Sequence, residues 1–361
     1  MTVAKNFSGF AFDRSRSVSN YACMKALLAV SIAAGFVFLD LAELDLRAEV
    51  NKVETVAPGI YFHEGDLGRK GHCNNGWIVF DDYVLVVDGN FPSGALEVIP
   101  KIKATTDKPI RFTFDTHHHG DHAYGNQVWL DTGATPVAHF GVLEEMKKCE
   151  TGHFGSQPGR WEDTAKDRKD VAASKLKPPT LLFNKDLIFH DGKRRVELLH
   201  FGVAHTRGDG FAWLPNERIL FTGDACVNGP YNFMGDGDTG EWVKTLEAAR
   251  KLQPKAICPG HGPMGGLEVL DNQIAFIVEL HKEVKKLVDA GIKPAEVKAA
   301  AALIKETLRK NDRIAIYIGQ FLDAQVEKVY TEMGGQPFPK KETAFNSPRQ
   351  RAESSVFAAR R

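Results

Sequence analysis

Cysteine is scarce in this 361-residue chain, and no two cysteines are spaced as a Cys-x-x-C pair. An odd, scattered set argues against a disulfide framework. It also argues against a structural zinc knuckle, which needs closely spaced thiolates. The five cysteines are Cys23, Cys73, Cys149, Cys226 and Cys258. Hydrophobic residues at 43% and charged residues at 25% are ordinary for a globular protein.

An excess of charge of one sign is also absent. Lys plus Arg and Asp plus Glu both number 46, so the formal net charge is zero. A nucleic-acid partner would call for a basic surface, which this balance does not favour. Steering toward an anionic membrane has no support either. We therefore expect a small-molecule substrate and no nucleic-acid partner.

Hydrophobic runs of bilayer length are absent as well. The apolar run over 26–39 ends at Asp40 and is too short for a helix that crosses about 30 Å of hydrocarbon. No stable membrane span is expected. With Met24 and Lys25 before it, the run fits an export signal, so we interpret 1–48 as an N-terminal extension with a signal peptide. This predicts a periplasmic or secreted protein; a buried or membrane-associated helix is the alternative, and without a signal the protein would be cytoplasmic.

Beyond residue 50, short strand-like runs alternate with helical stretches, and there is no internal repeat. Turn signals separate paired strands, and two groups of strands, each interrupted by a helix, predict two sheets packed face to face with helices outside. Expected strands are 52–57, 59–63, 76–80, 83–88, 111–116, 186–190, 194–199, 210–214, 218–222 and 256–258. Expected helices are 93–104, 240–252, 265–290, 294–310 and 316–333. The predicted division is a catalytic domain over 49–275 with an inserted helical cap at 140–180, C-terminal helices over 276–335, and a disordered tail over 336–361.

A histidine-rich run follows the strand predicted over 111–116. His117 and His119 are two residues apart, so in an extended segment they face the same side and can hold one metal ion. After Gly120, where a sharp turn is expected, Asp121 and His122 point elsewhere. Two ligand pairs from one turn suit two metal ions a few ångströms apart. An adventitious metal-binding tract is the alternative, but it would lack a buried strand before it and further ligands downstream.

Three downstream residues supply the missing ligands. His205 follows the strand over 194–199, and His261 follows the strand over 256–258 with a glycine on each side. Asp224 ends an apolar strand, and a carboxylate there can bridge two cations. Imidazole and carboxylate ligands without thiolates favour Zn, Fe or Mn. We expect two divalent ions, with Zn(2+) favoured and Fe or Mn as alternatives.

At these residues the sequence resembles the metallo-β-lactamase superfamily, over roughly residues 52–275. The resemblance implies an α/β fold, a four-layer αββα sandwich of two mixed β-sheets, here with a C-terminal helical extension. It implies that the first metal is bound by His117, His119 and His205. It further implies that Asp121, His122 and His261 bind the second metal, with Asp224 bridging. In β-lactamases proper the position of Asp224 typically carries Cys or Ser, so the aspartate resembles the glyoxalase II, lactonase and related esterase branches.

The ligand set predicts hydrolysis of an ester, thioester, lactone or related activated acyl substrate by a metal-bound hydroxide. Asp121 is the predicted catalytic residue, which orients the hydroxide and accepts its proton. β-Lactam amide hydrolysis is one alternative. A mononuclear iron persulfide dioxygenase is another, but a complete second ligand set speaks against it. A protein that keeps metal without catalysis is disfavoured because every ligand is present.

Several neighbouring residues have two interpretations. Asp88 is either a carboxylate that fixes a ligand histidine or an ordinary aspartate at a strand end. His118 either lines the pocket or packs. Cys226 is expected to be a core thiol. Asn228, Tyr231 and Asn232 are either oxyanion donors on a loop that faces the site or loop-forming residues.

Overall fold

The computed structural model describes residues 50–155, 158–336 and 338. The export signal predicted within 1–48 lies outside the described residues, and so does nearly all of the predicted tail over 336–361. No helix in the described ranges combines the length and apolar character needed to cross a membrane.

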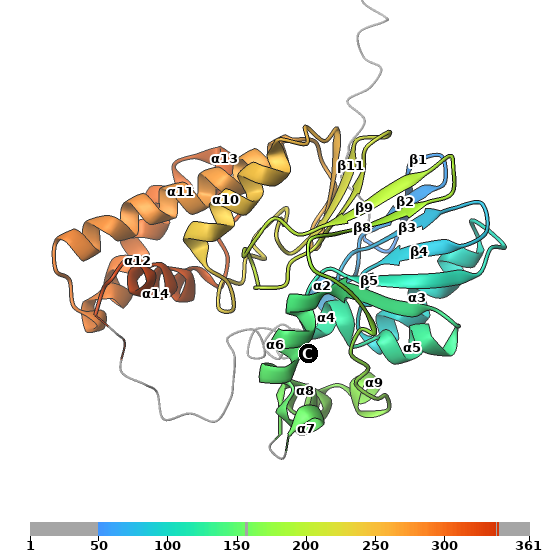
Figure 1. Ribbon diagram of the computed structural model, residues 1–361. Helices are drawn as coiled ribbons and strands as arrows, with labels where there is room; N and C mark the ends of the chain where they lie inside the picture. The colour runs from blue at the N-terminus through green and yellow to red at the C-terminus, as the bar shows by residue number, and fades with distance from the viewer. Residues whose placement is uncertain (1–49, 156–157, 337, 339–361) are drawn as a thin grey trace, which may run out of the picture. The chain divides into compact units, whose positions relative to one another are not determined.

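The first sheet has seven strands in the order β1-β2-β3-β4-β5-β6-β7 (Figure 1). Strands β1 to β4 pair antiparallel, and β4 to β7 pair parallel. The strands are β1 (Val53–Ala57), β2 (Ile60–His63), β3 (Asn75–Val79), β4 (Val84–Val87), β5 (Ile110–Asp115), β6 (Thr135–His139) and β7 (Leu181–Phe183). Every residue of β4 is buried, as expected for a central strand that is covered on both faces.

The second sheet has five strands in the order β12-β11-β10-β9-β8. Strands β8 to β11 form antiparallel hairpins, and β12 pairs parallel with β11. The strands are β8 (Asp186–His190), β9 (Arg195–Leu199), β10 (Phe211–Leu214), β11 (Ile219–Gly223) and β12 (Ala256–Pro259). The β8–β9 hairpin turns at Asp191-Gly192: Gly192 has a φ of 93°, and the Asp191 side chain accepts from the backbone amides of Lys193 and Arg194.

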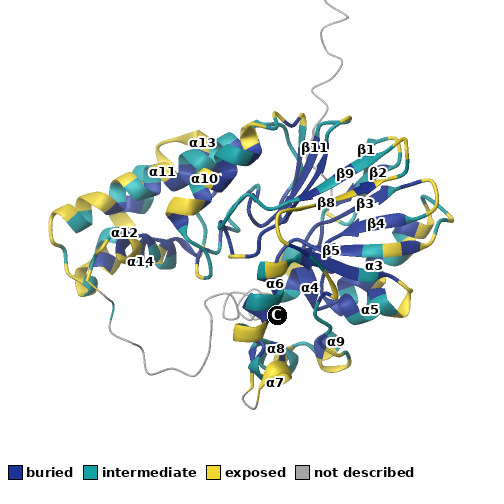
Figure 2. Ribbon diagram, viewed as in Figure 1, coloured by how far each residue is buried: buried dark blue, intermediate teal, exposed yellow. Residues whose placement is uncertain are grey.

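Four layers result from the way the two sheets bury their faces. Between the sheets lies a core of aromatic and branched side chains that includes Phe62, Phe114 and Phe221. Trp77 and Trp129 belong to a second core, between the first sheet and the helices outside it, α3 (Pro92–Lys103) and α5 (Asn126–Asp131). A third core joins the second sheet to α10 (Thr239–Arg250) and α11 (Glu268–Asp289). The predicted αββα sandwich of two mixed sheets is confirmed. Figure 2 shows β3, β4 and β11 largely in the colour of buried residues, whereas β1 and β8 are mostly intermediate or exposed.

Four helices lie between β6 and β7, within the predicted insertion. They are α6 (Phe140–Cys149), α7 (Thr151–Phe154), α8 (Arg160–Asp167) and α9 (Lys169–Ala172), and we call them the inserted helices. Trp161 and Val171 attach them to the rest of the fold, because both pack in a buried cluster with Phe91 and Tyr124. Figure 1 shows these helices below the first sheet, beside α4 (Gly120–Ala123).

The C-terminal helices extend the third core. They are α11, α12 (Pro294–Arg309), α13 (Asp312–Ala315) and α14 (Leu322–Glu332). The helix predicted over 316–333 is wrong at its start, because the chain turns after α13 and α14 begins at Leu322. At that turn Gly319 lies so close to Pro230 that a Cβ atom would be 2.7 Å from the proline ring. The turn therefore brings the C-terminal helices against the loop that follows β11.

The ends of two parallel strand pairs define one functional edge. In the first sheet β4 leads to Asp88 and β5 leads to the histidine run. In the second sheet β11 leads to Asp224 and β12 leads to His261. Because parallel strands end at the same edge of a sheet, the topology gathers residues that are far apart in the sequence.

Candidate metal centre

The chain bends through the histidine run after β5, His119 has extended backbone angles, and α4 then begins at Gly120. Gly120 is not among the glycines with a positive φ, so the predicted sharp turn is not what requires it. Instead, a Cβ atom on Gly120 would lie 2.6 Å from the Tyr124 ring. Close packing of that ring against the run therefore explains the glycine.

The three residues predicted to bind the first metal form a compact group. The ring centroids of His117, His119 and His205 are 4.6–4.8 Å apart, and the rings stand nearly perpendicular to one another. One ligand atom from each lies within 4.8 Å of the others. His205 Nε2 is 2.8 Å from His119 Nδ1. Three imidazoles thus converge on one point, as they would around a single ion.

The residues predicted to bind the second metal form an adjacent group. His261 Nε2 lies 3.1 Å from Asp121 Oδ2 and 3.4 Å from His122 Nε2. His122 Nε2 lies 3.6 Å from the same Asp121 oxygen. Ligand atoms that are each about 2.0–2.2 Å from a tetrahedral zinc ion lie roughly 3.3 Å from one another, so these spacings suit zinc.

Asp224 lies between the two groups and turns a different oxygen toward each. Its Oδ1 is 3.2 Å from His122 Nε2 and 3.4 Å from His261 Nε2. Its Oδ2 is 3.6 Å from His205 Nε2. The geometry therefore matches that of a bridging carboxylate. Gly260 permits this approach, since a Cβ atom there would lie 2.2 Å from Asp224 Oδ1.

The donor set fits cations. His117 Nε2 and Asp224 Oδ1 are buried and have no hydrogen-bond partner among the described residues, although imidazole nitrogens surround them. Burial and the neighbouring histidines hold the pKa of His117 well below its usual range, so its imidazole is neutral and can act as a ligand. Burial would raise the pKa of Asp224, yet His261 and His122 hold it well below its usual value. The first group therefore offers a neutral imidazole at His117, and Asp224 offers an ionised carboxylate.

Asp88 holds His122 from the side away from the other ligands. Its Oδ1 accepts hydrogen bonds from the Thr116 backbone amide and hydroxyl, and its Oδ2 is 3.0 Å from His122 Nδ1. Asp88 also has a φ of 69°, a left-handed conformation that is uncommon for a residue with a side chain. These contacts favour the positioning role over that of an ordinary strand-end aspartate.

Two further histidines of the predicted ligand set are held by groups that the sequence prediction missed. His205 Nδ1 donates to the Phe233 carbonyl at 2.7 Å. His119 Nε2 donates to Asp236 Oδ2, also at 2.7 Å. Both acceptors lie on the loop after Asp224, whose glycine-rich sequence Gly235-Asp236-Gly237 is a weak local signal for a loop near a site.

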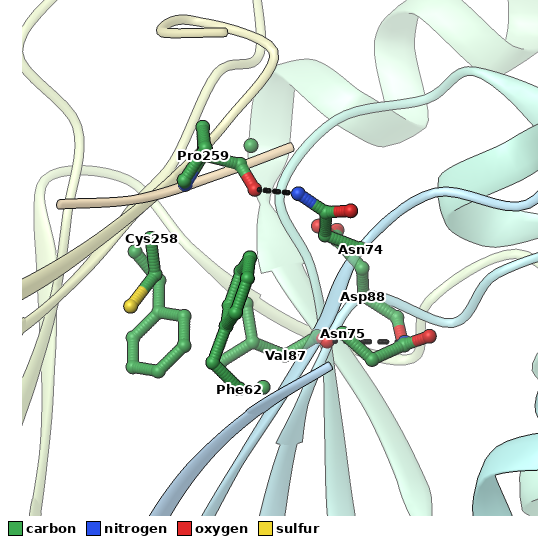
Figure 3. Close-up of a pocket in the computed structure, with 10 residues that line it drawn as sticks. Phe62, Asn74, Asn75, Val87, Asp88, Cys258 and Pro259 are labelled. Atoms are coloured by element: carbon green, nitrogen blue, oxygen red, sulfur yellow. Dashed lines mark hydrogen bonds between the residues drawn. The ribbon is translucent and has the colours of Figure 1, made fainter. Parts of the chain in front are cut away.

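Asn74, which was also missed, holds the loop that carries His261. Its side-chain amide donates to the carbonyls of Pro259 and Gly262, both at 2.8 Å, and its Oδ1 accepts from Gly65 N–H at 3.0 Å. Figure 3 shows the Asn74 amide pointing at Pro259, beside a cavity of about 10 Å³. A space of this size holds about one water molecule, so this cavity is not a substrate site.

His118 and Cys226, the remaining candidates near the histidine run and Asp224, both pack in the interior. His118 is buried, with Nε2 3.8 Å from Cys149 Sγ, so it packs under the inserted helices. Cys226 is a buried core thiol, as predicted, and burial raises its pKa. Another buried thiol, Cys73, lies within 4.8 Å of Asp88 and His122 and was not predicted to be near the site.

The loop residues after Asp224 also differ in role. The Asn228 amide donates to the Pro263 carbonyl, which makes Asn228 a loop-forming residue. The Tyr231 ring lies 5.9 Å from the His261 ring, and burial raises the pKa of its phenol, so the phenol keeps its proton. The Asn232 side chain is buried, with both polar atoms unpartnered within the described chain. Tyr231 thus stays a candidate donor near the site.

A family model described as the metallo-beta-lactamase superfamily matches residues 68–261, a span that includes every predicted ligand. The match covers more than half of the chain, and the αββα fold with its histidine and aspartate cluster agrees with it. The chain belongs to the metallo-beta-lactamase superfamily, a superfamily of hydrolases.

Individual relatives are distant. A metallo-beta-lactamase type 2 of Pseudomonas aeruginosa is 22% identical over 253 residues, 65% of this chain and 87% of that protein. Another from Bacteroides fragilis is 32% identical over 82 residues, 21% of this chain and 33% of that protein. Among solved structures, a metallo-beta-lactamase from Pontibacter korlensis superposes with a TM-score of 0.52 and 17% sequence identity. The superposition covers 63% of this chain and 98% of that protein's chain. This structural likeness supports the shared fold alone.

Proposed function

We propose that this protein is a dinuclear metal-dependent hydrolase that acts on an ester, thioester, lactone or related activated acyl substrate. Zinc is the favoured metal, with iron or manganese as alternatives. The position of Asp224 carries this proposal, because its two carboxylate oxygens face two different groups of potential ligands. A carboxylate at this position resembles the glyoxalase II and lactonase branches rather than the β-lactamases proper.

Each group of ligands would hold one ion. His117, His119 and His205 would hold the first, and Asp121, His122 and His261 the second, with Asp224 shared. Two bound divalent cations would supply Lewis acidity, which lowers the pKa of water toward neutrality and polarises a scissile carbonyl.

The side chains of the site supply the rest of the proposed chemistry. Asp121 is buried, and its Oδ2 faces His261, so it can orient the attacking water and accept its proton. The protonated Tyr231 phenol can donate a hydrogen bond to the oxyanion that develops on the substrate. Asp88, Asp236 and the Phe233 carbonyl keep the ligand rings in fixed orientations.

β-Lactam hydrolysis is the second candidate function. It is favoured by the names of the relatives, since the Pseudomonas aeruginosa protein and the Pontibacter korlensis structure are both called metallo-beta-lactamases. Asp224 argues against it. An iron persulfide dioxygenase is a third possibility, and the second group of ligands argues against a mononuclear centre.

A substrate panel with the metal-loaded full chain tests the proposal. The panel contains a lactone, a thioester, a phosphodiester and a chromogenic cephalosporin. We expect acyl substrates to be turned over by the wild type and by the exposed-histidine control His153→Ala, and not by His261→Ala. Cephalosporin as the best substrate would favour the second candidate. A single bound iron with oxygen consumption would overturn the hydrolase proposal.

A further inference from the structure

His119 is linked to the inserted helices through two charged side chains. Its Nε2 donates to Asp236 Oδ2 at 2.7 Å. Arg160, the first residue of α8, binds the same carboxylate with both terminal nitrogens, Nη1 to Oδ2 at 2.6 Å and Nη2 to Oδ1 at 2.9 Å. The three residues come from three separate parts of the chain, so only the folded protein assembles them.

This arrangement selects the nitrogen that His119 presents to the metal centre. A neutral imidazole carries one N–H, and the carboxylate that accepts it fixes both the tautomer and the ring orientation. With Nε2–H directed at Asp236, the lone pair of Nδ1 faces inward, where it lies 2.8 Å from His205 Nε2. Asp236 can rotate unless it is held, and the two-pronged contact from the planar Arg160 guanidinium holds it.

The inserted helices have their own attachment beside the histidine run. The buried Glu150 accepts hydrogen bonds from the Tyr124 hydroxyl and, at 2.7 Å, from the Trp161 backbone amide. Tyr124 packs against Gly120, which lies between two predicted ligands. This attachment fixes the start of α8, and therefore Arg160, next to Asp236.

Arg160 and Asp236 remain partly open to solvent, with side-chain exposures of 29% and 18%. The other supports of the ligand histidines, Asp88 and the Phe233 carbonyl, come from the sandwich and its own loops. The Arg160–Asp236 contact, in contrast, reaches His119 directly from the inserted helices. Loss of the Arg160 side chain would therefore release Asp236 and His119 while leaving Asp88 in place beside His122.

We infer that Arg160 is a positioning residue for the first metal ion, and that the inserted helices set the affinity of that ion through Asp236 and His119. This inference rests on the proposed dinuclear centre and adds a means of regulating it.

The test measures cobalt binding to the full chain by optical titration against a competing chelator. Two backgrounds separate the sites: His261→Ala disables the second group, and His205→Ala disables the first. We expect Arg160→Met to weaken binding about 10- to 100-fold in the His261→Ala background. In the His205→Ala background we expect no change. Arg160→Lys, which keeps one charged donor, should recover part of the lost affinity and of the cobalt absorption spectrum.

Arg168→Met is the matched control. Arg168 also belongs to the inserted segment and attaches it by stacking over the Phe91 ring at 3.6 Å and by donating to the Lys70 carbonyl. It does not take part in the contact with Asp236. Thermal melting followed by circular dichroism checks that each variant folds.

Equal losses in Arg160→Met and Arg168→Met would show a general effect of docking and would overturn the inference. Unchanged first-site affinity in a folded Arg160→Met protein would overturn it as well. If the wild type binds no cobalt, or only one ion, the dinuclear centre itself fails. Failure of the dinuclear centre is distinguishable from failure of the Arg160 inference, because it is seen in the wild-type protein.

Discussion

Replacement of Asn74 by alanine should weaken both the fold and the second metal site. The side chain makes three buried hydrogen bonds, with the Gly65 amide and with the carbonyls of Pro259 and Gly262. Each such bond contributes about 1 kcal/mol net, so the variant should lose about 3 kcal/mol of stability. For a domain of this size the loss corresponds to a fall of roughly 5 °C in melting temperature.

The effect on the metal follows from the same contacts. Pro259 and Gly262 flank the segment that carries His261, so a loosened loop should weaken the second site about tenfold and spare the first. Calorimetry gives the stability, and chelator competition gives the two affinities. The control is Asn216→Ala, at an exposed turn position, which should change stability by less than about 0.5 kcal/mol. An Asn74→Ala protein with unchanged melting temperature and second-site affinity would show that Asn74 does not hold the loop that carries His261.

Three further changes test other parts of the account. Asp88→Asn should weaken the second site about 10- to 100-fold in a chelator titration, because His122 Nδ1 loses the carboxylate that lies 3.0 Å from it; unchanged affinity would contradict this role. Gly260→Ala should abolish binding of the two metal ions that Asp224 is proposed to bridge, because the added Cβ would collide with Asp224. Metal analysis that shows full occupancy would disprove the collision. Burial and the adjacent His200 ring lower the pKa of His139 to about 4, against the opposing effect of its hydrogen bond to the Asn184 carbonyl, so its neutral form is favoured in the folded state. Stability should therefore fall as pH drops from about 6.5 toward 4. His139→Asn, which can still cap α6, should make this fall smaller in thermal melts at a series of pH values. An unaltered pH profile would contradict the role of His139.

The sequence allowed prediction of the elements whose patterns are local. Alternating apolar residues and strong turn signals were sufficient for the hairpins of both sheets, and helical spacing was sufficient for α3 and α10 to α12. Strands β6 and β7 were missed for physical reasons. Pro136 lies inside β6, where proline normally argues against a strand, and β7 has only three residues.

The candidate ligands could be found because strand ends carry them and because the histidine run is so dense. The residues that orient them could not be found in the same way. Asn74 contacts a loop 185 residues away, and Asp236 contacts His119 across 117 residues. Such contacts depend on how the two sheets and the inserted helices are packed, and no periodicity or spacing in the chain encodes them.

Metal content of the purified chain, measured by elemental analysis in the wild type and in Asp224→Ala, separates a dinuclear from a mononuclear centre. We predict two divalent ions per wild-type chain. The variant should lose the second ion and most turnover, because the shared carboxylate is gone. A wild type that holds a single ion, or an Asp224→Ala protein with unchanged metal content and rate, would contradict the dinuclear site.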